Sequence, residues 1–89
     1  MLEEVKRALA ITWDDEGIDL RINELIKQSQ SAIDELLGVE IDYTSNLIAK
    51  ELMINRIRYA YNNALEYFET NFQKEILRLQ LMIGVQNAK

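Results

Sequence analysis

The stretch DEGIDLRINELIKQSQSAIDELLG, residues 15–38, decides the fold of this chain. At about 100° per residue, its apolar side chains gather on one broad arc that has the small Ser29 at its centre. The arc consists of Ile18, Ile22, Leu25, Ile26, Ala32, Ile33, Leu36 and Leu37. This pattern predicts a helix over residues 15–37, roughly 35 Å long, whose arc belongs to the core. Ser29 would permit a close helix crossing, and Gly38 is the expected left-handed terminator.

The acidic residues before this helix predict how it starts. Thr12 and Asp15 have the spacing of a capping box, and acids here would stabilise the positive end of the helix dipole. Asp14, Glu16 and Asp19 also raise the question of a metal site. The nearby glycine stands at the wrong offset for a calcium loop, however, and no distant glutamate is in register with it. Capping is therefore the favoured interpretation, and no metal ligand is assigned.

The N-terminal residues predict a short first helix. Leu2, Val5 and Leu9 are spaced by three and four, as on one side of a helix over residues 2–10. The first seven residues lack the basic start and apolar stretch of a secretion signal. We therefore expect the protein to work where it is made, in a cytoplasm.

The connection after the long helix alternates apolar and polar residues. Val39, Ile41 and Tyr43 are the apolar positions, so residues 38–46 are expected to be extended and half buried. The segment could pair with a strand of another subunit, or it could be a loop that packs its apolar residues on the domain. The loop is favoured, because one isolated strand has no partner within the chain.

Residues 45–69 predict a third helix that is apolar on two sides. Its core face consists of Leu47, Met53, Ile54, Ile57, Tyr61, Ala64, Leu65 and Phe68. A second, narrower stripe consists of Ile48, Leu52 and Tyr59. Either the first helix covers this stripe or another subunit does, and the sequence leaves both possibilities open.

The charged residues of this third helix indicate a solvated surface. Arg56 and Arg58 form a modest cationic patch, but two arginines in an acidic protein do not make a phosphate-binding track. Glu51, Glu66 and Glu69 suggest a carboxylate-bridged metal site. The chain has no histidine to supply the Glu-x-x-His halves of such a site, so these glutamates are predicted to lie on the surface.

A fourth helix is predicted to begin near Asn71 and to end before Gly84. The segment that starts with Thr70 has the pattern of a second capping box. The inner face of this helix consists of Phe72, Ile76, Leu79, Met82 and Ile83. Leu77, Leu81 and Val85, spaced by four, form another stripe roughly opposite. A terminal helix can cover only one face with its own domain, so this stripe indicates a missing partner, although three residues can also align by chance.

The composition limits the fold class and excludes most enzymes. The 89 residues suit a single domain with a thin core of its own, followed by a flexible tail at residues 86–89. The absence of cysteine and histidine excludes disulfide scaffolds, thiol catalysis and histidine general-base chemistry. No apolar run approaches the roughly 18–20 residues of a membrane span. We expect an all-α, compact bundle of about four helices with one long central helix pair and short loops, and no enzymatic activity, catalytic residue, cofactor or metal.

Charge is distributed unevenly along the chain. Residues 1–45 carry eleven acidic and four basic residues, whereas residues 46–89 carry four acidic and six basic ones. This polarity reflects either two differently solvated surfaces or head-to-tail association, in which the acidic face of one subunit meets a neutral or basic face of the next. The net charge of −5 disfavours free-standing nucleic-acid binding.

The order of these features resembles one family. Residues 2–16, LEEVKRALAITWDDE, are similar to the opening of the small head-tail connector proteins of long-tailed bacteriophages, in which a short helix leads through an acidic turn into a long helix. That long helix ends near a Leu-Gly pair in the family, as it would at Leu37 and Gly38 here. Residues 58–68, RYAYNNALEYF, resemble the end of the family's third helix, and residues 72–83 resemble its leucine-rich last helix.

The resemblance implies a structural role in the virion. Members of this family form a homo-oligomeric ring below the portal protein, extend the channel for DNA and dock the next head-completion protein or the tail. The resemblance therefore implies assembly in a bacterial cytoplasm and a final place at the head-tail junction, with DNA passing through unbound and no membrane contact. The candidate contacts are Ile48, Leu52 and Tyr59 on one helix and Leu77, Leu81 and Val85 on another. The alternative is a small helical interaction module that acts as a dimer, as a regulator or adaptor.

Overall fold

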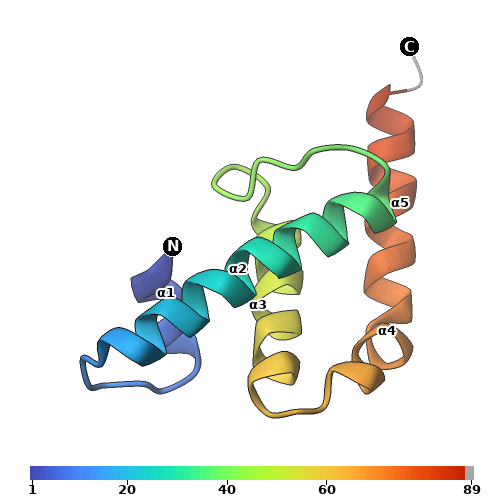
Figure 1. Cartoon of the computed structure of the whole chain (residues 1–89). Helices are drawn as coiled ribbons and strands as arrows, with labels where there is room; N and C mark the ends of the chain where they lie inside the picture. The colour runs from blue at the N-terminus through green and yellow to red at the C-terminus, as the bar shows by residue number, and fades with distance from the viewer. Residues whose placement is uncertain (88–89) are drawn as a thin grey trace.

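The computed structural model describes the backbone of residues 1–87 and the side chains of residues 1–84, and the regular elements of this part of the chain are all helices (Figure 1). They are α1 (Leu2–Ala8), α2 (Glu16–Leu37), α3 (Leu47–Tyr61), the 3₁₀ turn η1 (Leu65–Tyr67), α4 (Phe68–Asn71) and α5 (Gln73–Asn87). The predicted all-α class is confirmed, and the short α4 accounts for the difference from about four helices.

The helices form a plate about two layers thick. α3 and α5 lie beside each other and run in opposite directions, and α2 crosses both (Figure 1). α1 packs against α2. The described part of the chain measures 46 × 25 × 17 Å, and two packed helices already account for roughly the smallest dimension. Each helix in such a plate has one face toward the core and one toward solvent.

Helix α2 begins and ends much as its sequence predicts. The side chain of Asp15 accepts a hydrogen bond from the backbone N–H of Ile18 at 3.1 Å, so Asp15 is the N-cap and the exposed Thr12 lies outside the helix. At the other end, Gly38 takes a left-handed conformation with φ of 74°, as expected for a terminator. The predicted apolar arc faces the core, with Ile18, Ala32 and Leu36 at its half-buried margins.

A small polar residue of α2 is buried where this helix contacts α3. Ser29 is fully buried, and its hydroxyl accepts a hydrogen bond from Nη1 of Arg56 at 3.0 Å. Burial lowers the pKa of Arg56, and the charge of Glu69 opposes that shift. Arg58 is exposed but donates to the backbone carbonyl of Ala8 at 3.2 Å. The interpretation as a solvated patch therefore holds for the exposed Arg58, but it was wrong for Arg56, which is half buried and bonds to α2.

Helix α3 ends eight residues earlier than the predicted Glu69. Asn63 has a φ of 57°, and the N–H groups of Asn63 and Ala64 bond the carbonyls of Ala60 and Tyr59 at 3.2 and 2.8 Å. These two bonds form a Schellman motif, in which asparagine can replace glycine because it tolerates the left-handed region. Two consecutive asparagines at positions 62 and 63 were the available signal for this stop.

The same motif shortens the first helix. Ala10 has a φ of 60°, and Ile11 N–H bonds the carbonyl of Lys6 at 2.9 Å. α1 therefore ends at Ala8, before the predicted Ala10. The buried side chain of Ile11 then enters the core directly after the turn.

The last helix starts later and ends later than predicted. Phe72 is the C-cap of α4, so α5 begins at Gln73. Gly84 lies inside α5, which continues to Asn87. Glycine stops a helix only where the chain takes the left-handed turn, and Gly38 is the one glycine of the described residues with positive φ. Of the predicted flexible tail, residues 86–87 continue α5 and residues 88–89 lie outside the described residues.

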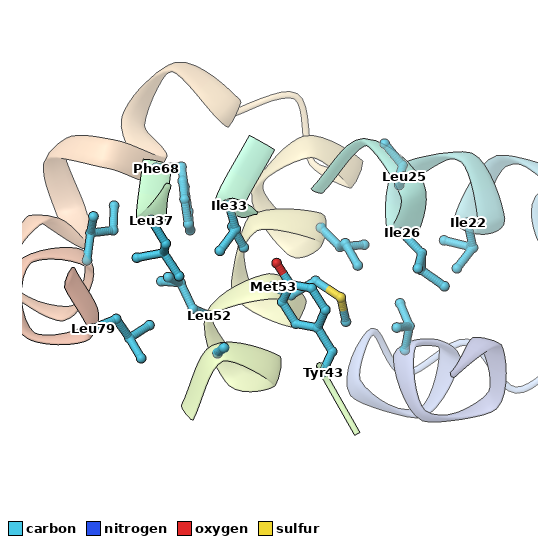
Figure 2. Close-up of a cluster of buried hydrophobic side chains, with 14 of the residues drawn as sticks. Ile22, Leu25, Ile26, Ile33, Leu37, Tyr43, Leu52, Met53, Phe68 and Leu79 are labelled. Carbon is cyan, nitrogen blue, oxygen red and sulfur yellow. The ribbon is translucent and has the colours of Figure 1, made fainter. Parts of the chain in front are cut away.

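The connection between α2 and α3 is a loop that is fastened to α2. Tyr43 is buried beside Met53 (Figure 2), and its hydroxyl donates to Oδ1 of Asp34 at 2.7 Å. The same carboxylate oxygen accepts the N–H of Ile41 at 3.2 Å. No strand occurs within residues 1–87, so the favoured loop interpretation describes this segment. Two hydrogen bonds to Asp34 therefore fasten the loop to α2, and Val39 and Ile41 pack against the core.

Substitution of Ser29 by alanine tests the role of the crossing. Ser29→Ala should lower the free energy of unfolding by about 1–2 kcal/mol, because the half-buried guanidinium of Arg56 loses an acceptor. Ser31→Ala, at an exposed position of the same helix, is the matched control and should change little. Urea unfolding followed by circular dichroism measures both. Equal stability of the two variants would contradict this role for Ser29.

Alkaline pH tests the contribution of the buried Tyr43 hydroxyl and its hydrogen bond to Asp34. Burial, and then the hydrogen bond to Asp34, raise the pKa of Tyr43 above its ordinary value of 10.0. A raised folded-state pKa means that this stabilisation is complete below pH 10 and is lost as pH rises beyond it, by up to about 1.4 kcal/mol per pH unit. Tyr43→Phe should show a shallower alkaline loss than the parent protein in urea titrations between pH 9 and 11. Tyr67→Phe, at an exposed ring, should keep the parent slope.

Candidate interaction surface

Helix α5 has a buried face and an exposed face, both apolar. Ile76, Leu79 and Ile83 are buried against α2 and α3, and the Gln80 side chain donates to the carbonyl of Leu36 at 2.9 Å. These contacts fix the rotation of α5 about its axis. Leu77 and Leu81 then lie on the outer side, where 54% and 63% of their surface is exposed.

Two cations share this outer side. The exposed residues of this side are spaced by three, one and three along α5. They are Lys74, Leu77, Arg78 and Leu81. On a helix this spacing places them in one row, so we call these four residues the outer stripe. Neither cation forms an ion pair within the described side chains. Two residues of the predicted stripe, Leu77 and Leu81, are therefore exposed on this side. The side chain of the third, Val85, lies outside the described residues.

A groove opens on another side of α5, between its C-terminal half and the loop after α2. It has a volume of about 650 Å³. Its apolar walls include Val39, Ile41, Leu47, Ile48 and Met82, and its acidic residues are Glu40 and Asp42. We call this feature the loop groove. Leu47, Ile48 and Met82 are all exposed, so the groove presents apolar surface to solvent.

Asp42, one of the two acidic residues of the loop groove, has a pKa below its ordinary value. Hydrogen bonds from the hydroxyl and then the backbone N–H of Thr44 lower the pKa of Asp42, with a further contribution from Ser45. The Thr44 N–H lies 3.0 Å from Oδ1 of Asp42. These bonds also order the turn that leads into α3, whose N-cap is Asn46.

The predicted stripe on α3 is divided by the fold. Ile48 is exposed in the loop groove, but only 3% of Leu52 is exposed, so Leu52 belongs to the core between α3 and α5. Figure 2 shows Leu52 among the core side chains, near Leu79. Tyr59 is half buried and packs edge-on against Phe68 and Phe72, at centroid distances of 6.0 and 5.5 Å. Residues of the same chain therefore cover Leu52 and Tyr59, so these two side chains need no second subunit to cover them.

Two lysines of α1 and α3 form ion pairs within the fold. Lys6 is buried, and its Nζ lies 2.9 Å from Asp19 and 3.2 Å from Asp14. Hydrogen bonding to Asp19 raises the pKa of Lys6, against the effect of burial. Lys50 pairs with Glu4 between α3 and α1. These pairs leave Lys74 and Arg78 as exposed cations at the α5 side of the plate.

Several exposed apolar residues were not foreseen from the sequence. Leu47 was assigned to the core but is 67% exposed, and it occupies the first position of α3 in the wall of the loop groove. Leu65 and Met82, also assigned to inner faces, are exposed. Because α3 ends at Tyr61, Leu65 is not part of this helix and does not lie on its predicted core face. Leu20, between polar neighbours on α2, was visible in the sequence as an outward leucine.

The described residues also bear on metal sites and membrane spans. They contain no cluster of three or more metal-ligating side chains, and Asp14 and Asp19 instead pair with Lys6. None of the helices in residues 1–87 is both long and apolar enough to cross a membrane. Glu51, Glu66 and Glu69 are exposed, as expected for surface residues.

Comparison with known proteins identifies no relative. No protein-family model, curated protein or solved structure gives a significant match to this chain.

Paired substitutions on α5 test which face carries the fold. Leu81→Asp should change the unfolding free energy of the dilute protein by less than about 0.5 kcal/mol, because this side chain faces solvent. Leu79→Ala should cost about 2–5 kcal/mol, because Leu79 is fully buried. Urea unfolding at micromolar concentration gives both values. A large loss for Leu81→Asp would show that the rotation of α5 differs from that described.

Proposed function

We propose that this chain is a structural head-tail connector subunit of a tailed bacteriophage, which forms a ring below the portal protein. In this role the ring extends the DNA channel and docks the tail or the next head-completion protein. The observation that carries the proposal is the terminal helix α5, which exposes Leu77 and Leu81 on the side opposite its buried face. A thin plate with unused apolar surface suits a subunit that is completed by its neighbours.

The order of the elements is compatible with the resemblance. A short helix, α1, leads through an acidic turn into the long α2, which ends at Leu37 and Gly38. The third and last helices, α3 and α5, follow.

Two distinct exposed apolar features support a ring rather than an isolated subunit. A closed ring needs two different surfaces on each subunit, because every subunit contacts a neighbour on either side. The outer stripe and the loop groove are two such surfaces, on different sides of α5. DNA would be enclosed by the ring without being gripped, which agrees with a protein of net charge −5.

Mass measurement tests this role. Light scattering over a concentration series, alone and with the portal protein from the same genome, should reveal rings of many subunits or assembly that depends on the portal. Leu81→Asp should weaken that assembly while the variant remains folded. A stable dimer that is indifferent to the portal would contradict the connector role and support the alternative of a dimeric adaptor or regulator.

A further inference from the structure

The outer stripe and the loop groove are complementary in shape. The stripe is the convex side of a helix, and its two leucines project from it. The groove is concave, and its exposed apolar residues Leu47, Ile48 and Met82 belong to two different helices, α3 and α5. An amphipathic helix that lays its apolar residues into an apolar groove is a common form of protein recognition.

The two surfaces are also complementary in charge. Lys74 and Arg78 accompany the leucines of the stripe, and Glu40 and Asp42 accompany the apolar residues of the groove. All four charged side chains are exposed. Stripe against stripe would bring the cations of two copies into one contact, and groove against groove would do the same with the acids. Stripe against groove is the pairing that places opposite charges together.

We propose that the outer stripe of one copy docks in the loop groove of a second copy. This contact rests on the proposed ring and identifies the two surfaces that join its neighbouring subunits. The stripe lies on the side of α5 that carries Leu77 and Leu81, whereas the groove lies on the side that carries Met82. The contact is therefore heterologous, and its repetition leads to a ring or a filament, because each copy keeps one free stripe and one free groove.

Cysteine cross-linking tests the contact directly. The chain has no cysteine, so an introduced thiol is the only one present. Leu81→Cys places a thiol in the stripe, and Ile48→Cys places one in the groove. Under mild oxidation, an equimolar mixture should give a disulfide-linked dimer at least about tenfold faster than either variant alone. The double variant should give a ladder of higher species on a non-reducing gel.

The control is Leu20→Cys, whose leucine is 61% exposed, nearly as much as Leu81, and belongs to the N-terminal part of α2. Helix α2 begins at the end of the plate that lies away from α5 (Figure 1). Mixed with Ile48→Cys, it should cross-link only at the collisional rate. Circular dichroism of each variant establishes that it is folded. Arg78→Glu in the stripe partner should slow the cross-link about tenfold, and Glu40→Lys in the groove partner should restore part of that rate.

Two results would overturn the proposed contact. One is a mixture that cross-links no faster than the Leu20→Cys control. The other is Leu81→Cys protein that dimerises as fast alone as in the mixture, which would indicate a two-fold contact between stripes. Rings seen by light scattering without the 48–81 cross-link would retain the connector role and reject this contact. The cross-link without any large or portal-dependent assembly would retain the contact and reject the ring.

Discussion

The crossing of α2 over α3 at the buried Ser29 is the contact on which the rest of this structure depends. A small side chain at position 29 lets the two helices approach and still offers an acceptor to Arg56. On either side of that crossing, α2 also contacts α1, the loop and α5. Lys6 of α1 pairs with Asp19, Tyr43 of the loop bonds Asp34, and Gln80 of α5 bonds the carbonyl of Leu36. Each of these ties is polar and has its acceptor on α2, while the apolar arc beside them supplies the core.

A two-layer plate explains why this chain has apolar surface left over. With a thickness of 17 Å, the described part of the molecule has no interior position where a helix can be covered on all sides. α5 is at the edge of the plate and turns one face to α2 and α3 (Figure 1). Its second apolar face, and the groove beside it, therefore remain in water until a partner covers them. Lys6, Lys50 and Arg56 make polar contacts between helices within the subunit. Lys74 and Arg78 instead lie beside the exposed leucines of α5.

Much of the fold was predictable because it follows from local rules. The apolar period of α2, its acidic start and Gly38 indicated a long helix with correct limits to within a residue. The candidate site was predictable in part, since Leu77 and Leu81 followed from the period of α5 and Ile48 from that of α3. Leu52 and Tyr59 were not separable from Ile48 by sequence, because all three have the same helical spacing. Burial of Leu52 depends on α5, and the packing of Tyr59 depends on Phe68 and Phe72, all of which lie outside α3.

The sequence by itself determined the helical class, the limits of α2, the absence of thiol and imidazole chemistry, and a second apolar side on the last helix. These properties depend on residue type and on spacing within a few turns. Only the tertiary structure decided that Arg56 serves the crossing, that α3 stops at Tyr61, and that Leu47, Ile48 and Met82 meet in one groove beside two acids. The physical reason is that exposure and charge pairing depend on which elements pack together, and that choice is made by the whole set of contacts.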